Sequence, residues 1–255
     1  MLKINGKTIT GVVYKGKRIE RIMVGGKKYY DMHDGKIIGN ALEAGSIRID
    51  GKTYSYGVGY FEISVGELKS ASLKELFINK KISTITHLGI DTRRVTSMQS
   101  MFQGCSFLTS LDVSGFNTQN VTNMYGMFHS CSSLTSLDVS GFNTQNVTTM
   151  YGMFQNCSSL TSINLGNEFD ASKVMFAQNM FGGCTLLKTI TGSIKNLSIS
   201  LSLSDCPLDH DSAMRIINGL ATVTTAQTLT LSSTTKGKLS AAEKAIVINK
   251  GWTLA

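Results

Sequence analysis

The two carboxylates of this chain that come closest to a catalytic pair stand one repeat apart. Asp112 and Asp138 occupy the same place in two copies of LDVSGFNTQNVT, at 111–122 and 137–148. On neighbouring parallel strands their Cα atoms are expected about 5 Å apart, and a glycosidase needs two facing carboxyl groups. Repetition alone explains why the aspartate recurs, so we expect no enzyme and no catalytic residue, with glycan hydrolysis as the alternative.

The cysteines and histidines also have the wrong spacing for a reactive or metal site. Four cysteines recur once per repeat, at steps of 26, 26 and 27 residues, without the paired spacing of a zinc site. We therefore expect buried free thiols that pack as small apolar groups. The stretch DHD at 209–211 could hold a cation, but a helix N-cap explains it better. No metal and no cofactor is predicted.

The cysteines belong to a set of ladders that define an internal repeat. Five residue types recur in phase: Cys105, Cys131, Cys157 and Cys184; Met101, Met127, Met153 and Met180; Phe102, Phe128, Phe154 and Phe181; Leu108, Leu134, Leu160 and Leu187; Val95, Val121, Val147 and Val174. Such self-similarity is typical of repeat proteins, in which each unit buries its apolar face only against its neighbours.

Each repeat combines two hydrophobic periodicities. LTSLDVS alternates apolar and polar residues, which predicts a short half-buried strand. NVTNMYGMF places Val121, Met124 and Phe128 at helical spacing, which predicts a short helix. The outward strand positions are small and polar, and they suit hydroxyl-rich or polar ligands or simply solvation. The candidate binding residues on this face are Ser110, Asp112, Ser114, Ser136, Asp138, Ser140, Ser162 and Asn164, with Tyr125 and Tyr151 as possible edge contacts.

The wording of the repeat resembles a known family. MFQGCSFLTSLDVSGFNTQNVTNM at 101–124 and MFHSCSSLTSLDVSGFNTQNVTTM at 127–150 are similar to BspA-like leucine-rich repeats. The resemblance covers roughly residues 82–190. It implies a mixed α/β fold, a leucine-rich-repeat solenoid with a parallel sheet and short helices. It also implies a phage tail or virion structural protein or a bacterial surface protein.

The segments on either side of the repeats differ in composition. We expect a basic β-hairpin module at 1–36 for docking or oligomerisation, a β-rich connector and cap at 37–81 ending in a helix (LKSASLKELFINK), the repeats at 82–204, and C-terminal capping α/β units at 205–255. VYKGKRIERIMVGGKKYYD resembles hairpin modules of phage tail proteins, and the closing KLSAAEKAIVINKGWTLA resembles the ends of phage structural proteins. In the last segment we expect a helix capped by Asp209 or Asp211 and another capped by Ser240.

Charge separates the hairpin module from the repeats. Residues 1–36 hold nine Lys or Arg against three Asp or Glu, whereas residues 95–189 hold two against four. The candidate docking residues of the module are Lys7, Lys15, Lys17, Arg18, Lys27 and Lys28. The alternative is that these lysines keep an exposed strand edge soluble.

The function expected from these features is display of a binding face. We expect a non-enzymatic phage virion protein, made in the host cytoplasm, whose hairpins dock on other virion proteins while the repeats bind a host cell-surface protein or glycan. A homo-oligomer is possible, and nucleic acid is not an expected partner. No apolar run of signal-peptide or membrane-span length follows the start MLKINGKTIT. The alternative is a bacterial cell-surface adhesin.

Overall fold

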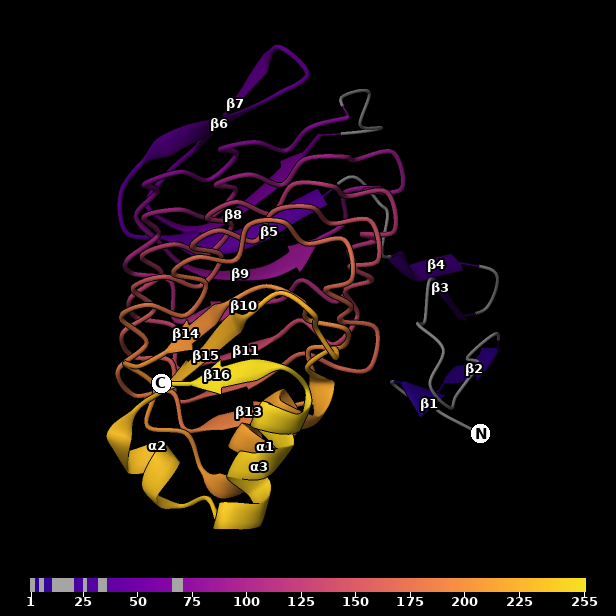
Figure 1. The fold of residues 1–255 in the computed structure, drawn as a ribbon. Helices are drawn as coiled ribbons and strands as arrows, with labels where there is room; N and C mark the ends of the chain where they lie inside the picture. Colours follow the sequence, from indigo (N-terminus) through magenta and orange to yellow (C-terminus); the bar gives the residue numbers. More distant parts are fainter. Residues whose placement is uncertain (1–2, 5–6, 11–20, 25–26, 32–35, 66–70) are drawn as a thin grey trace.

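The protein has a mixed α/β fold with several separate sheets, few helices and no closed barrel in its described part. The computed structural model describes residues 3–4, 7–10, 21–24, 27–31, 36–65 and 71–255, the first four ranges by backbone alone (Figure 1). The predicted mixed class is therefore confirmed.

Four short strands, β1 (Lys3–Ile4), β2 (Lys7–Thr10), β3 (Arg21–Val24) and β4 (Lys27–Asp31), form an antiparallel sheet of their own. Strand β1 pairs antiparallel with β2, and β3 pairs antiparallel with β4.

A mixed sheet in the order β10-β9-β5-β8 precedes the repeats. Strand β5 (Lys36–Ala41) pairs antiparallel with β8 (Gly59–Ser64) and β9 (Ile82–Leu88), while β6 (Gly45–Ile49) and β7 (Lys52–Tyr56) form a separate hairpin. Gly39 lets β5 approach β9 closely, because a Cβ there would clash with the Thr84 carbonyl oxygen. Strand β10 (Ser110–Leu111) then adds to β9 in parallel, which joins this sheet to the first repeat.

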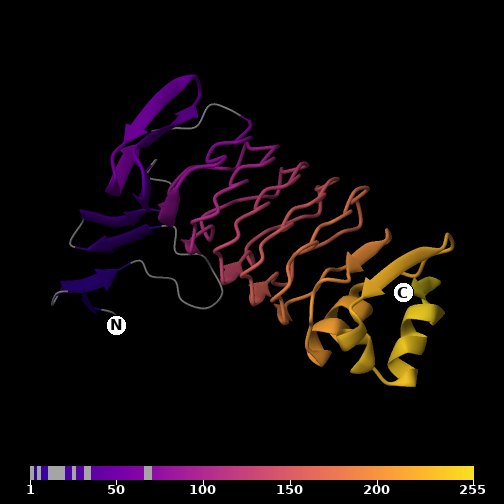
Figure 2. The ribbon, with the colours of Figure 1, turned by 90° about the vertical axis from the view of Figure 1, so that its left-hand side faces the viewer.

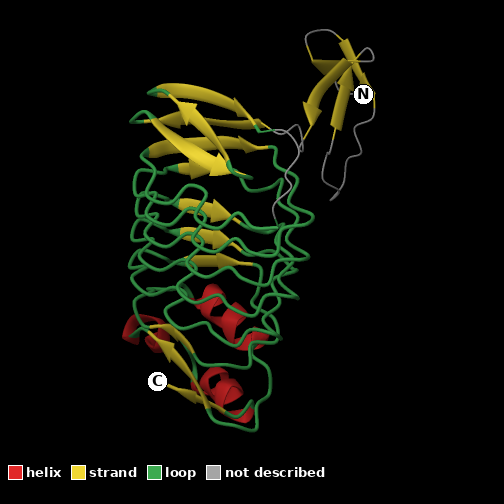
Figure 3. Ribbon diagram, turned by 90° about the horizontal axis from the view of Figure 1, so that it is seen from above, coloured by secondary structure: helices red, strands yellow, loops and turns green. Residues whose placement is uncertain are grey.

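Residues 71–206, which we call the repeat stack, form consecutive turns of chain lying one on another (Figures 1 and 2). A row of parallel bridges, Ser72–Ser97–Asn123–Thr149–Phe176, joins equivalent positions of successive turns. Each turn also contributes a short strand: β11 (Ser136–Asp138), β12 (Ser162–Asn164) and β13 (Thr189–Thr191) form a parallel sheet. The strands lie together on one side of the stack (Figure 3).

The short helix predicted in each repeat is absent from the described turns, and that prediction is wrong. Alternate backbone N–H groups donate to the next turn and not to the residue four positions earlier: Met124 to Thr149, Gly126 to Tyr151 and Phe128 to Met153, at 2.9–3.0 Å. The N–H groups between them close tight turns within the repeat, as Met127 does onto Met124 at 3.3 Å. A helix would direct all of these groups along its own axis and leave the neighbouring turn without donors.

The helix expected in LKSASLKELFINK is wrong for the same reason over residues 71–80, which are its described part. Leu73, Glu75, Phe77 and Asn79 donate their N–H groups to the carbonyls of Ser97, Gln99, Met101 and Gln103, at 2.7–2.9 Å. This segment is therefore the first turn of the repeat stack.

Two left-handed positions in every turn make this bonding possible. Glu75, Ser100, Gly126, Gly152 and Asn179 form one ladder of positive φ, and Asn79, Gly104, Ser130, Asn156 and Gly183 form a second, with φ between +53° and +73°. Glycine adopts this conformation freely and asparagine with little strain, whereas other residues are disfavoured. Most N–H groups of these residues donate to the adjacent turn, for example Gly104 to His129 at 2.8 Å.

The predicted ladders form the core. The cysteine, methionine, phenylalanine, leucine and valine ladders are buried to 3 % exposure or less. The rings of Phe77, Phe102, Phe128, Phe154 and Phe181 stack with centroids 5.2–5.6 Å apart. Buried threonines join the turns: the Thr118 hydroxyl donates to the Asn143 carbonyl at 2.9 Å and accepts the Asn143 N–H at 2.8 Å.

The C-terminal residues form a second short parallel sheet with helices beside it (Figure 1). Its elements are β14 (Leu201–Leu203), α1 (His210–Gly219), β15 (Gln227–Leu231), α2 (Ser233–Gly237), α3 (Ala241–Asn249) and β16 (Trp252–Leu254). Of the two candidate caps of α1, Asp209 is the N-cap, and Ser240 caps α3 in a reciprocal pair with Glu243. Helix α2 was not predicted. None of the helices in the described part is long and apolar enough to cross a bilayer.

The left-handed positions give a first prediction. Gly126→Ala should lower the free energy of unfolding by about 1–2 kcal/mol, because φ is +55° there while an added Cβ meets no atom closer than 3.6 Å. Gly237→Ala is the control: it lies in α2 with open space around its Cβ position, so the same change should stabilise by about 0.5–1 kcal/mol. Urea unfolding measures both changes, and equal effects on the two variants would contradict a left-handed conformation at Gly126.

Candidate functional site

The predicted binding residues lie on the outer surface of the strands, which we call the strand face: Ser110, Asp112, Ser114, Ser136, Asp138, Ser140, Ser162 and Asn164. All eight are exposed or half-buried, whereas Val113, Leu137, Val139 and Ile163 between them are buried. Ser136 pairs with Ser162, and Asp138 with Asn164, on adjacent strands. The pattern of alternation therefore predicted correctly which side chains point outward here.

The strand face is interrupted between its first two identical copies. Strand β10 pairs only with β9, and β11 pairs only with β12, so no pairing joins β10 to β11. Asp112, just after β10, and Asp138, in β11, were expected on neighbouring strands, but these two strands are not paired with each other. The Thr109 N–H donates to Ser83 at 2.8 Å and the Thr161 N–H donates to Thr135 at 2.8 Å, but the described residues provide no such acceptor for the Thr135 N–H.

This opening is local to the strands, because the same two turns are joined elsewhere. The Met98 N–H donates to the Asn123 carbonyl at 2.9 Å, and the Ser133 hydroxyl donates to the Ser106 carbonyl. The Thr118–Asn143 contact described above also links them. The two turns thus remain stacked while their strand edges stay unpaired.

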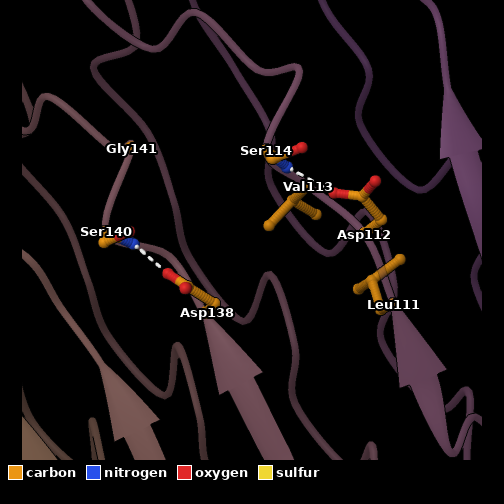
Figure 4. Close-up of a pocket in the computed structure, with 7 residues that line it drawn as sticks. All are labelled: Leu111, Asp112, Val113, Ser114, Asp138, Ser140 and Gly141. Atoms are coloured by element: carbon orange, nitrogen blue, oxygen red, sulfur yellow. Dashed lines mark hydrogen bonds between the residues drawn. The ribbon is translucent and has the colours of Figure 1, made fainter. Parts of the chain in front are cut away.

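A hollow of about 440 Å³ occupies the interruption (Figure 4). We call it the strand-face hollow, and its lining residues are Leu111, Asp112, Val113, Ser114, Asp138, Ser140 and Gly141. Sequence reasoning placed four of these seven on the candidate face but missed Leu111, Val113 and Gly141. Leu111 is only half-buried, whereas its counterpart Leu137 is 4 % exposed. No signal in the sequence distinguishes the two leucines, because the copies are identical.

The two aspartates of the hollow each hold the backbone two residues further on. Asp112 accepts the Ser114 N–H at 2.9 Å, and Asp138 accepts the Ser140 N–H at 2.8 Å (Figure 4). Asp138 also accepts from the Asn164 side-chain amide at 3.3 Å. Burial raises the pKa of Asp138, but the hydrogen bonds from Ser140 and Asn164 outweigh it and leave the pKa below its ordinary value. Asp138 is therefore ionised at neutral pH.

The tyrosines proposed as edge contacts lie away from the strands. Tyr125 and Tyr151 belong to the left-handed segments of their turns, and their rings stack with centroids 5.3 Å apart. Tyr125 is 41 % exposed and Tyr151 is half-buried. The structure thus brings the two tyrosines together but does not place them beside the strand-face hollow.

The five cysteines are buried free thiols, as predicted. Burial raises the pKa of Cys105 to about 12 and that of Cys184 to about 12. Each thiol donates to a carbonyl of the preceding turn, as Cys131 does to Phe102 at 3.2 Å. A protonated, buried sulfur is a poor nucleophile, so these residues serve packing.

The acidic DHD stretch is accounted for by helix contacts. Asp209 accepts the Ser212 N–H as the N-cap of α1, and His210 Nε2 lies 2.9 Å from a Glu243 oxygen on α3. The hydrogen bond with Glu243 raises the pKa of His210. In the described part of the chain, no group of three or more His, Cys, Asp or Glu side chains is placed to hold a metal ion.

The candidate docking residues of the basic hairpins stay predictions. Lys15, Lys17 and Arg18 lie outside the described residues. Lys7 begins β2, and Lys27 and Lys28 begin β4, where the backbone alone is described.

A second hollow, of about 480 Å³, lies between the β6–β7 hairpin and the first turn of the repeat stack. It combines Arg48, Lys74 and Lys80 with Glu75, and Lys74 lies 3.4 Å from the Glu75 carboxylate. Sequence reasoning did not anticipate it, because its two sides come from separate segments.

Comparison with known proteins supports the repeat assignment. Residues 71–193, just under half of the chain, match the model of a family described as "Mycoplasma protein of unknown function, DUF285". That family is associated with BspA-like repeat proteins. The matched range begins where the repeat stack begins and ends just after β13. A search of curated proteins finds no match.

The aspartates give a second prediction, on pH. The pKa values of Asp138, Asp170 and Asp209 lie below the ordinary value of 3.8, because hydrogen bonds outweigh the opposing effect of burial. The unfolded chain therefore binds protons more readily, so these groups stabilise the fold above pH of about 4 and lose that effect as the pH falls further.

We expect the urea midpoint to fall between pH 4 and pH 2, and the triple variant Asp138→Asn, Asp170→Asn, Asp209→Asn to show a smaller fall. Amide replacements keep the acceptor oxygens but do not titrate. An identical pH dependence of the wild type and the variant would contradict this role.

Proposed function

We propose that the protein is a non-enzymatic phage virion structural protein, of the tail or particle surface, that displays a leucine-rich-repeat solenoid for attachment to the host surface. The observation that carries the proposal is the strand face. It is a polar surface presented by adjacent turns and held by a core that repeats with the same register. Surfaces of stacked repeats are common binding faces.

The chemistry of the described residues favours binding over catalysis. The aspartates of the strand face each accept a backbone N–H, and the cysteines are buried and protonated. The rows of serine hydroxyls and carboxylates offer donors and acceptors to a polar ligand. The partner of this face is, in our proposal, a host cell-surface protein or glycan.

The basic hairpins are the proposed attachment to the particle. Strands β1–β4 form a sheet separate from those of the repeats. Lys7, Lys27 and Lys28 begin strands of this sheet, in a segment whose excess of Lys and Arg suits an acidic partner surface. Many copies on one particle would gain avidity from weak individual contacts.

A bacterial cell-surface adhesin is the second candidate. It is favoured by the match of residues 71–193 to a family associated with BspA-like repeats. The two candidates share the strand face as the binding surface and differ in what carries it.

The strand face gives a third prediction. The double variant Ser136→Tyr, Ser162→Tyr should bind host cells at least about tenfold more weakly, because bulky rings would cover outward positions of two adjacent strands. The control is Thr122→Tyr, Thr148→Tyr, which adds the same rings to the bridged segments of the stack. Flow cytometry of cells with fluorescently labelled full-length protein measures both. Equal binding by the two variants would remove the strand face from the proposal.

Location separates the two candidates. Immunogold labelling with antibody against residues 85–255 should decorate purified particles under the phage proposal. Label on bacterial cells, with particles bare, would favour the adhesin instead.

A further inference from the structure

The two places where the parallel sheet of the repeats ends differ in how the strand edge is covered. At β13 the next turn supplies side chains in place of a strand. The Ile190 N–H donates to the Ser212 hydroxyl at 2.8 Å, and the Thr189 hydroxyl donates to Asp209 at 3.0 Å. Ser212 is 1 % exposed, so the bond from the Ile190 N–H is buried. The fold therefore completes this edge with its own groups.

The facing edges of β10 and β11 receive no such replacement from the described residues. The Val139 N–H donates away from the hollow, to Asn164 at 2.9 Å, while the equivalent Val113 N–H has no acceptor among the residues that the structure describes. Both strands have the sequence TSLDVS, so the opening comes from their positions in the stack and not from their side chains. Backbone polar groups require partners, and here only solvent or a ligand can supply them.

The strand-face hollow between these edges offers three kinds of contact at once. Asp112 uses one carboxylate oxygen for the Ser114 N–H, and its other oxygen has no donor among the described residues. Ser114 and Ser140 add hydroxyl groups at the rim. Leu111, which is half-buried, adds apolar surface. In Figure 4 the two aspartates come from neighbouring turns on either side of the opening.

These contacts restrict the chemistry of the occupant. A phosphate or another anion would be repelled by two carboxylates. A simple cation would use the carboxylates but leave the backbone donors and the apolar surface unused. An inserted peptide strand would have to separate turns that stay hydrogen-bonded on both sides of the opening, at Ser106–Ser133 and Thr118–Asn143.

We infer that the strand-face hollow is a subsite for one saccharide unit of a surface glycan. Sugar hydroxyls donate to Asp112 and Asp138 and accept from the unpaired Val113 N–H, while the C–H face of the ring packs on Leu111. The volume of about 440 Å³ lies within the range of about 300–1,000 Å³ that is common for small-molecule sites. The inference rests on the proposed function, because it names the ligand of the same face.

The test is nuclear magnetic resonance titration of the ¹⁵N-labelled full-length chain with methyl glycosides of glucose, galactose, mannose, rhamnose and N-acetylglucosamine. At least one should shift the amide signals of residues 111–114 and 138–141 in a saturable way. Calcium chloride and lysine methyl ester are titrated in parallel as simple cations.

The variants Asp112→Asn and Asp138→Asn should each weaken binding about tenfold or more, since each removes a charged acceptor. Asparagine is tolerated in this turn, because Asn164 occupies the equivalent place and accepts the Gly166 N–H at 3.2 Å. Asp170→Asn is the matched control. Like Asp138, Asp170 accepts an N–H two residues on and an asparagine amide from the next turn, but it lies outside the hollow. It should leave affinity within about twofold.

A variant that fills the hollow, Ser114→Tyr, tests the site without removing charge and should abolish the shifts. Absence of saturable shifts with every glycoside, shifts confined to other residues, or shifts produced equally by the cations would each overturn the inference.

A cell-binding assay with the same protein distinguishes failure of the saccharide-subsite inference from failure of the proposed function. A protein that attaches to cells but binds no saccharide would overturn only the inference that the strand-face hollow is a saccharide subsite. Saccharide binding by a protein that attaches to no cell would overturn the proposed function.

Discussion

The fold depends on one constraint: each turn of the repeat stack takes its hydrogen-bond partners from the next turn. Two left-handed residues per turn, such as Gly126 and Ser130, direct N–H groups outward along the stack. Equivalent positions must then align from turn to turn, which is why apolar residues recur at the same step and the rings of Phe102 and Phe128 stack. The ends of the stack need substitutes, and the carboxylate of Asp205 provides one by accepting the Gly183 N–H at 2.7 Å.

The sequence predicted the parts of the fold that follow from repetition. The five ladders predicted the core, alternation predicted which strand residues point outward, and Asp209 and Ser240 were recognised as helix caps. The predicted repeat helix was wrong because Val121, Met124 and Phe128 have the same burial in a helix and in a spiral of turns. Hydrophobic spacing does not show where the N–H groups point; Gly126 and Gly152 were the available signal.

The strand-face hollow was not predictable in the same way. Thr109–Val113 and Thr135–Val139 are identical in sequence. Yet β10 pairs with β9, the strand that precedes it in the chain, whereas β11 pairs with β12, the strand that follows it. Strand β9 belongs to the mixed sheet before the repeats, in which it also pairs with β5 through two register shifts. A near-perfect duplication thus yields two different surroundings, and a binding site can arise where the sheet changes partner without any change of residue type.

The measurement that tests this account most directly is native-state amide hydrogen exchange on the two identical copies. Their intrinsic exchange rates are matched, because the flanking residues are the same. The account predicts that Val139, Thr109 and Thr161 are protected by their bonds to neighbouring turns, while Val113 and Thr135 exchange much faster. Equal protection of Val113 with Val139, and of Thr135 with Thr161, would show a continuous sheet. That result would contradict both the interruption and the hollow built on it.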